Sequence, residues 1–231
     1  MSESRVALIS GASRGIGEAI ARSLAEAGWQ ISLAMRDPVL PSWADAENTQ
    51  IVAYDAARSQ EQNWVGEALK RFGRIDALVA NAGIMIPKNV IEAEDADLDA
   101  MLDVNVKAPR RLAAAAWDAL CVSGRGRVII LGSLSGKRVK SASAGLYSIS
   151  KFAAVALAHG IRQAGWESGI RATALCPGFV ATDMARSLTD RDAGAMTQPS
   201  DIARIALMLL DLPNEASVAE FTINCQLEEM Y

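Results

Sequence analysis

The sequence predicts an α/β protein: one domain over residues 1–231 with a mostly parallel, doubly wound sheet of seven strands and helices on both faces. Three observations predict it. Short apolar runs alternate with helical patterns, a glycine-rich turn follows the first run, and polar or glycine residues follow nearly every later run. Such alternation is typical of a parallel sheet whose crossover helices cover both faces. At 231 residues and 51% hydrophobic content, the chain can bury one large core.

The predicted strands are the apolar runs at residues 6–9, 31–34, 51–54, 77–80, 128–131, 172–175 and 221–223. Helical patterns lie between them, including a long segment at about 97–120 and another at about 147–166. In a doubly wound sheet, ligands bind beyond the carboxyl ends of the strands, near the point where strand order reverses. We therefore expect the functional residues directly after the runs.

The first run leads into a turn that contains Gly11, Gly15 and Gly17, and a helical pattern then continues to Gly28, a typical helix stop. Glycines let the backbone turn sharply and approach a pyrophosphate closely, while free amide groups at a helix start attract the anion. A glycine-rich turn can also be purely structural. The order strand, turn, helix is what favours a phosphate cradle here.

Tyr147 and Lys151 are four residues apart on a predicted helix, so both side chains lie on one face. A tyrosine hydroxyl is almost fully protonated at neutral pH. A cation about 4 Å away, at an effective dielectric near 20, stabilises the phenolate by about 4 kcal/mol, which lowers its pKa by about three units. The pair predicts a phenol that exchanges protons near neutrality, although the same spacing also occurs on ordinary solvated helices.

Composition disfavours several other classes of function. The net charge of −4 and the scattered lysines and arginines provide no basic stripe for nucleic acid. No apolar run approaches a membrane span and no leader pattern is present, so we expect a cytoplasmic protein without membrane contact. Cys121, Cys176 and Cys225 lack zinc or disulfide spacing, and His159 is the single histidine, so we expect no metal.

The motifs occur along the chain in a recognisable order: Gly11-x-x-x-Gly15-x-Gly17, Asn81-Ala82-Gly83, Asn105, Ser133, Tyr147-x-x-x-Lys151 and Pro177-Gly178. With them, the stretch from Val6 to about Thr182 resembles the short-chain dehydrogenase/reductase family in its compact, Rossmann-like form. The resemblance implies an NAD(P)-dependent oxidoreductase that interconverts a carbonyl and an alcohol on a small molecule. Reduction of 3-oxoacyl thioesters, sugars, steroids, pterins and simple aldehydes all occurs on this scaffold.

The resemblance implies four catalytic residues: Asn105, Ser133, Tyr147 and Lys151. Tyr147 would be the general acid in reduction and the base in oxidation, and Lys151 would lower its pKa and hold the nicotinamide ribose. Ser133 would donate to the substrate oxygen, with Ser135 as the competing candidate. Asn105 would hold a water that joins Lys151 to a proton relay. Its alternative is an amide bonded to neighbouring backbone inside a helix.

The implied cofactor-binding residues are Gly11, Ser13, Arg14, Gly15, Ile16, Gly17, Arg36, Asp55, Ala56, Asn81, Ala82, Gly83, Tyr147, Lys151, Pro177, Gly178, Val180 and Thr182. Asp55 would bond the adenine amino group, and the segment after Pro177 would close over the nicotinamide carboxamide. Asn81 would line the cofactor and brace the central strands. Asp55 and Asn81 are also compatible with plain turn positions.

Charge at the end of the second strand selects between NADP and NAD. NAD-preferring relatives carry an acid at about Met35, whereas this chain has Arg14 in the glycine turn and Arg36 after the strand. Two arginines can hold a 2′-phosphate through charge-assisted hydrogen bonds, so NADP is favoured. Asp37 keeps NAD open as the less favoured cofactor, because a one-residue shift would bring it toward the ribose.

The segment at about 183–199, where relatives place substrate-covering helices, is short and rich in charge. We expect a homodimer or homotetramer, paired through the two long helical segments. Their small side chains permit close helix approach, although they also suit packing within one chain; they are Ala113, Ala116, Ala153, Ala154, Ala156 and Ala158.

The alternatives to an oxidoreductase are an NADP-binding sensor and a serine hydrolase. A catalytically idle NADP-binding sensor on the same fold remains the alternative, although such a protein has no need of four catalytic side chains. A serine hydrolase is excluded by its motif, because Gly132-Ser133-Leu134-Ser135-Gly136 has leucine where a nucleophile elbow needs serine.

Overall fold

The computed structural model describes residues 4–227, so residues 1–3 and 228–231 of the predicted domain lie outside the described residues. Seven strands form one sheet in the order β3-β2-β1-β4-β5-β6-β7, and every neighbouring pair is parallel. The strands are β1 Val6–Ser10, β2 Gln30–Met35, β3 Thr49–Ala53, β4 Ala77–Ala80, β5 Arg127–Leu131, β6 Arg171–Pro177 and β7 Glu220–Ile223. The predicted doubly wound fold is confirmed, with a fully parallel sheet.

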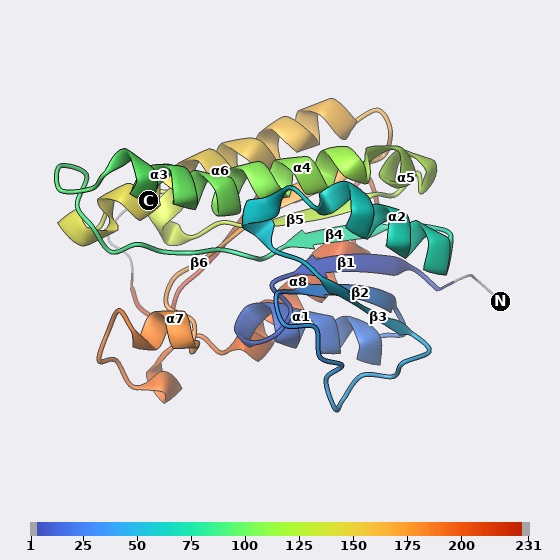
Figure 1. Ribbon diagram of the computed structural model, residues 1–231, viewed down its shortest axis with the longest axis horizontal. Helices are drawn as coiled ribbons and strands as arrows, with labels where there is room; N and C mark the ends of the chain where they lie inside the picture. Colours follow the sequence, from blue (N-terminus) through green and yellow to red (C-terminus); the bar gives the residue numbers. More distant parts are fainter. Residues whose placement is uncertain (1–3, 228–231) are drawn as a thin grey trace.

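Helices cover both faces of this sheet (Figure 1). They are α1 Gly15–Glu26, α2 Glu61–Phe72, α3 Asp95–Leu102, α4 Ala108–Ala115, α5 Trp117–Val122, α6 Gly145–Gly165, α7 Asp183–Arg186 and α8 Pro199–Asp211. One buried cluster joins α1 and α8 to one face, through residues such as Leu24 and Ile202. A second joins α2, α4 and α6 to the other, through Trp64, Leu112 and Ala154. Burial of apolar side chains on both faces explains why the strands read as continuous apolar runs.

Strand order reverses at β1, which pairs with β2 on one side and with β4 on the other. The chain leaves β1 for α1 on one face, while the crossover from β4 to β5 runs through α3, α4 and α5 on the opposite face (Figure 1). Connections that depart in opposite directions leave a crevice at the carboxyl ends of the central strands. The motifs after β1 and β4 therefore face a common space.

The long helix predicted at 97–120 is interrupted in the structure. It begins earlier, at Asp95, because Glu94 and Asp97 form a reciprocal capping box. A π-helical turn at Asp103–Lys107 separates α3 from α4, and a break at Ala116 precedes α5. π-bulges of this kind recur at functional sites. This one contains Asn105, whose side chain is buried.

The helix α6 carries Tyr147 and Lys151 in its first two turns. The stretch Ala142–Gly165 is long and apolar enough to pass a test for a membrane-crossing helix, with a mean hydropathy of 1.2 over its best window. Polar residues interrupt the apolar run in this stretch, so its apolar character is not evident from the sequence. Most of that window is buried inside the protein, where Ala154, Val155 and Ala158 pack on the sheet. A core helix of this kind meets the same criterion.

The small residues assigned to a pairing surface face inward for the most part. Ala113, Ala116, Ala154 and Ala158 are buried in the core cluster of their own chain. The alternative of ordinary intramolecular packing therefore holds for these four, and only Ala153 and Ala156 retain exposure.

Candidate active site

A cleft of about 1990 Å³ opens at the carboxyl ends of the strands. Seventeen of the eighteen candidate cofactor residues and three of the four candidate catalytic residues line this cleft. Those in the wall are Gly11, Ser13, Arg14, Gly15, Ile16, Arg36, Asp55, Ala56, Asn81, Ala82, Gly83, Ser133, Tyr147, Lys151, Pro177, Gly178, Val180 and Thr182. Gly17 and Asn105 do not line the cleft. Gly17 packs against Gly11 and Asn81, and Asn105 is hydrogen-bonded to Ile84.

The glycine turn has a geometry that side chains do not tolerate. Gly11 and Gly15 have φ values of +63° and +61°, in the left-handed region that favours glycine. At Gly17 a Cβ atom would lie 2.5 Å from Asn81 Nδ2 and closer still to the carbonyl oxygen of Gly11. The turn is therefore packed tightly against the segment that directly follows β4. This close approach fits a pyrophosphate cradle, and Arg14 at the start of α1 provides no side-chain cap for the first-turn amides.

Ser10 and Asn81 tie the glycine turn to β4. The hydroxyl of Ser10 accepts hydrogen bonds from the backbone amides of Asn81 and Ala82, each at 3.1 Å. The side-chain amide of Asn81 in turn donates to the carbonyl oxygens of Ser10 and Gly11, at 3.2 and 2.9 Å. Asn81 thus braces the central strands, as the resemblance implies. The part played by Ser10 was not predicted, and its position as the last residue of β1 was the available signal.

Tyr147, Lys151 and Ser133 converge on one wall of the cleft. Lys151 Nζ lies 5.6 Å from the centroid of the Tyr147 ring and donates to the carbonyl oxygen of Leu131 at 2.7 Å. Ser133 follows β5, its hydroxyl donates to the carbonyl oxygen of Pro177 at 3.5 Å, and it lies close enough to the Tyr147 phenol to lower the pKa of that group. Ser135, the competing candidate, donates its backbone amide to the Ser133 hydroxyl at 3.1 Å. Ser133 is therefore the serine that contacts Tyr147.

Burial dominates the electrostatics of this group. It raises the pKa of Tyr147 above its ordinary value, and the hydrogen bond with Ser133 pulls that pKa down only in part. Burial also lowers the pKa of Lys151 to about 8. The expectation that the Tyr147 pKa lies near neutrality is therefore wrong, because burial raises this pKa by more than the neighbouring groups lower it. At neutral pH the arrangement pairs a protonated phenol with a cationic amine.

Asn105 is held by protein groups on three sides. Its Oδ1 accepts from the amide of Ile84, and its Nδ2 donates to the carbonyl of Ile84 and to the hydroxyl of Ser150, all at 2.9 Å. Ser150 in turn donates to the carbonyl oxygen of Tyr147 at 2.8 Å. Asn105 therefore fixes the segment that follows β4 against the start of α6. The role of Asn105 in holding a water stays a prediction, and Ser150 was not predicted, because nothing in the sequence reveals its partner.

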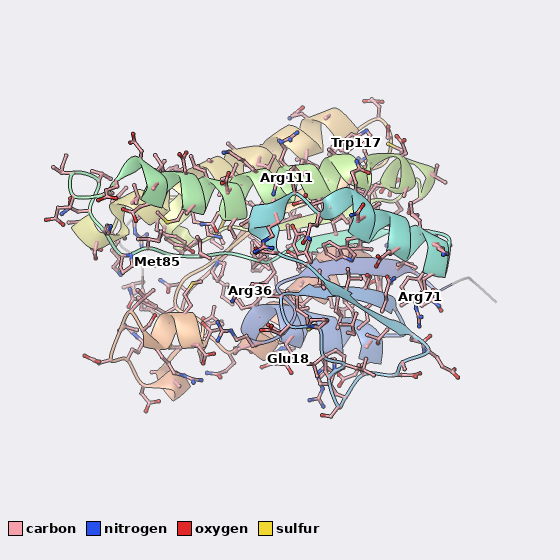
Figure 2. The ribbon with its side chains drawn as sticks, viewed as in Figure 1. Glu18, Arg36, Arg71, Met85, Arg111 and Trp117 are labelled. Carbon is pink, nitrogen blue, oxygen red and sulfur yellow. The ribbon has the colours of Figure 1, made fainter. Side chains whose placement is uncertain are left out.

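The two arginines assigned to the cofactor occupy different environments. Arg36 follows β2 at the cleft and forms no ion pair among residues 4–227 (Figure 2). Arg14 forms an exposed ion pair of 2.9 Å with Asp183, the first residue of α7. Asp55 caps the short turn after β3 by accepting from the amide of Ala57 at 3.0 Å, and it pairs with Arg58 at 3.3 Å.

The segment predicted as a short lid is pinned at both ends. Val180 and Thr197 form an isolated parallel bridge, and the Ala181 amide donates to the Thr197 carbonyl at 2.9 Å. Between them lie α7 and a 3₁₀ turn at Ala193–Ala195. Thr182 contacts the glycine turn, since a Cβ on Gly15 would lie 3.2 Å from its Cγ2.

Sequence reasoning missed much of the apolar and basic wall. Met85 (Figure 2), Phe179 and Met184 line the cleft, and so do Arg138 and Lys140 from the segment between β5 and α6. The sequence signal was weak, because these residues belong to irregular segments without a motif. Cys176, read as a buried hydrophobe, is fully buried, and burial raises the pKa of its thiol to about 11.

Known proteins match this sequence and share this architecture. The profile of the short chain dehydrogenase family matches residues 5–193. The chain belongs to the short-chain dehydrogenase/reductase family. Its members are NAD(P)-dependent oxidoreductases that act on CH–OH and C=O groups.

Individual members of the family align over nearly the whole chain. An agropine synthesis reductase from Rhizobium rhizogenes is 36% identical over 99% of this chain and 54% of its own length. The chain thus spans about half the length of that relative. An uncharacterized oxidoreductase from Staphylococcus saprophyticus is 33% identical, covering 96% of this chain and 97% of the relative. An alcohol dehydrogenase from Thermococcus sibiricus, solved with 5-hydroxy-NADP, superposes with a TM-score of 0.85 at 29% identity over 98% of this chain and 100% of the other.

Proposed function

We propose that the protein is an NADP-dependent oxidoreductase that interconverts a carbonyl and an alcohol, with Tyr147 as the general acid/base. One observation carries the proposal: Tyr147, Ser133 and Lys151 meet in a cleft whose far end is a glycine turn. A phenol with a hydrogen-bonding serine and a buried ammonium is a proton-donating group. A glycine turn at a helix start is a pyrophosphate-binding group. Their presence in one cleft joins proton transfer to nucleotide binding.

The described residues fit a dinucleotide along the cleft. The pyrophosphate would lie at the first turn of α1, where Gly11 and Gly15 leave the backbone accessible. Asp55 and Ala56 would face the adenine, and Gly178 and Val180 would face the nicotinamide. When bound, the cofactor supplies or accepts a hydride.

The chain's own residues then handle the proton. In reduction, the substrate oxygen would accept hydrogen bonds from the hydroxyls of Tyr147 and Ser133. Because burial raises the pKa of Tyr147, its hydroxyl keeps its proton at neutral pH and is available to the oxygen as negative charge develops there. The nearby Lys151 ammonium stabilises the phenolate that remains. Asn105 holds the start of α6 in place through Ser150.

NADP rather than NAD is the cofactor that the charges favour. Arg36 lies at the end of β2, where the 2′ position of the adenine ribose is read in this fold, and Arg14 lies across from it in the glycine turn. The solved complexes of similar chains include 5-hydroxy-NADP in the Thermococcus sibiricus enzyme and NADP in a Burkholderia cenocepacia dehydrogenase that is 27% identical. These complexes support NADP for this chain.

We also propose a cytoplasmic homodimer or homotetramer. The outer face of α6 exposes Ile149 and Phe152, each at 45%, and Ala156 lies one turn further along. An apolar strip on a helix is suited to pairing with a second copy about a two-fold axis. Phe152→Glu is expected to shift the assembly to monomer in size-exclusion chromatography with light scattering. Wild-type protein that already elutes as a monomer would overturn the pairing.

Tyr147→Phe tests the catalytic proposal, because it removes only the hydroxyl. Turnover is expected to fall about 10²- to 10⁴-fold, the usual contribution of a general acid. NADPH affinity, measured by fluorescence titration, is expected to stay within a factor of a few. The assay is a screen of ketones, aldehydes and alcohols that follows the absorbance of reduced nicotinamide. Full turnover by this variant would reject Tyr147 as the acid.

A further inference from the structure

A second, smaller pocket lies at the opposite ends of the strands from the cleft, where β1, β4 and β5 begin. Its volume is about 160 Å³, space for roughly five water molecules. Its wall is formed mostly by arginines, with one acid, one serine and two apolar residues: Arg5, Arg74, Arg125, Arg127, Asp76, Ser123, Trp29 and Leu210. Nothing in the proposed reaction uses this pocket.

Two of the four arginines have carboxylate partners. Arg74 pairs with Asp76 at 2.8 Å, and the remaining acceptor positions of Asp76 are taken by the Val6 amide and the Ser123 hydroxyl. Arg5 pairs with Asp211 at 2.5 Å. Neither Asp76 nor Asp211 forms an ion pair with the other two guanidinium groups among residues 4–227.

Arg127 and Arg125 are bonded to neutral acceptors instead. Arg127, only 3% exposed, donates to the Leu212 carbonyl at 2.6 Å and to Asn214 Oδ1 at 3.0 Å, as well as to two further carbonyls. Arg125 donates to the carbonyls of Asp211 and Leu212. Among residues 4–227 neither has an ion-pair partner. The four arginines of the wall therefore face one acid in the wall, Asp76, and one beside it, Asp211, which leaves an excess of two positive charges.

The cost of this charge is visible in Arg127. Burial lowers its pKa to about 10, and Arg125, Arg171 and Arg5 lower it further, against one acid, Glu215. A buried cation without a compensating anion is unfavourable, and a bound anion removes that penalty.

Trp29 provides an aromatic reporter in the wall of the pocket. Its indole is 2% exposed and lines the pocket, and its Nε1 has no hydrogen-bond partner among the described residues. Arg5 stacks on the ring, with its Cζ 4.0 Å from the ring centroid, and so holds the indole in place. The Nε1 atom is itself shielded from solvent, so the donors available to an oxyanion in the pocket are the guanidinium groups.

We propose that this pocket binds a small, doubly charged oxyanion of the phosphate or sulfate type, held by Arg125 and Arg127, with Trp29 in its wall. The volume is well below that of a pocket for a drug-sized ligand, which excludes a whole nucleotide from its interior. The charge excess of two matches a dianion. The site is distinct from the cleft, because the two lie at opposite ends of the strands.

The test follows the indole signals in nitrogen–proton NMR spectra of the whole protein during titration with inorganic phosphate at constant ionic strength. Trp29→Phe assigns the Trp29 signal. Phosphate is expected to shift that signal, with sulfate acting similarly and the monoanion acetate binding about tenfold more weakly or worse, since one charge-assisted bond is worth about that factor. Acetate binding as tightly as phosphate would overturn the dianion assignment.

A pair of variants separates this pocket from general charge effects. Arg125→Gln is expected to raise the phosphate Kd at Trp29 about tenfold, whereas Arg110→Gln, which removes an exposed arginine on α4, is expected to leave it unchanged. Thermal denaturation of both variants without phosphate checks that each is folded. An unmoved Trp29 signal in folded wild-type protein, or an unchanged Kd in folded Arg125→Gln, would reject the site.

Discussion

Lys151 donates from its ammonium group to the carbonyl oxygen of Leu131, the last residue of β5, at 2.7 Å. This bond anchors Lys151 to the central sheet rather than to the neighbouring phenol, whose ring centroid lies 5.6 Å from Nζ. Burial at this position lowers the pKa of Lys151 to about 8. The charge that stabilises a Tyr147 phenolate is therefore itself sensitive to pH in the alkaline range.

We predict that kcat/KM for carbonyl reduction falls as pH rises through about 8, because the free enzyme loses the Lys151 cation there. Lys151→Arg is expected to move this fall to higher pH, since a guanidinium keeps its charge. The measurement is a pH–rate profile of both forms. A wild-type profile that stays flat to pH 10 would contradict the assignment.

The lowered pKa of Lys151 has the opposite effect on stability, which increases with pH where kcat/KM decreases. The folded-state pKa of Lys151 lies below the ordinary value of 10.5, so between pH 8 and 10.5 the unfolded chain holds a proton that the folded chain has released. The contribution of Lys151 to the free energy of unfolding therefore rises with pH in that window. Denaturant unfolding of wild type and Lys151→Met across this range measures the difference.

Gly17→Ala is predicted to weaken cofactor binding and the fold together. A Cβ at this position would lie 2.5 Å from Asn81 Nδ2, so the glycine turn must shift away from β4. Such overpacking costs about 1–3 kcal/mol of unfolding free energy. Gly66→Ala is the matched control: Gly66 lies in α2 with no atom within 4 Å of a new Cβ, and the change is expected to stabilise the protein by about 0.5–1 kcal/mol. Equal denaturation midpoints for the two variants would contradict this account of the turn.

The sequence predicted the strands and the glycine turn well, because periodicity and local geometry determine them. All seven strands begin and end within a few residues of the apolar runs. The π-helical turn at Asn105 was not predictable in this way, since its extra residue is stabilised by the Ile84 backbone, which is 21 positions away. The predicted direction of the Tyr147 pKa shift was wrong for a related reason. Sequence gives the spacing to Lys151 but not the burial that dominates the titration.

Arg36→Asp is predicted to weaken NADPH binding about ten- to a hundredfold, the value of one or two hydrogen bonds to a charged group, while changing NADH binding far less. Arg36 follows β2 without an ion-pair partner among residues 4–227, so its charge is available to a 2′-phosphate, which NADH lacks. Arg204→Asp makes the same charge reversal at the rim of the cleft on α8 and is expected to affect both cofactors equally. Fluorescence titration with each cofactor gives the four dissociation constants. Because Arg14 is already paired with Asp183, Arg36 is expected to carry most of the discrimination between NADPH and NADH. Equal losses of affinity for the two cofactors in Arg36→Asp would contradict this role for Arg36.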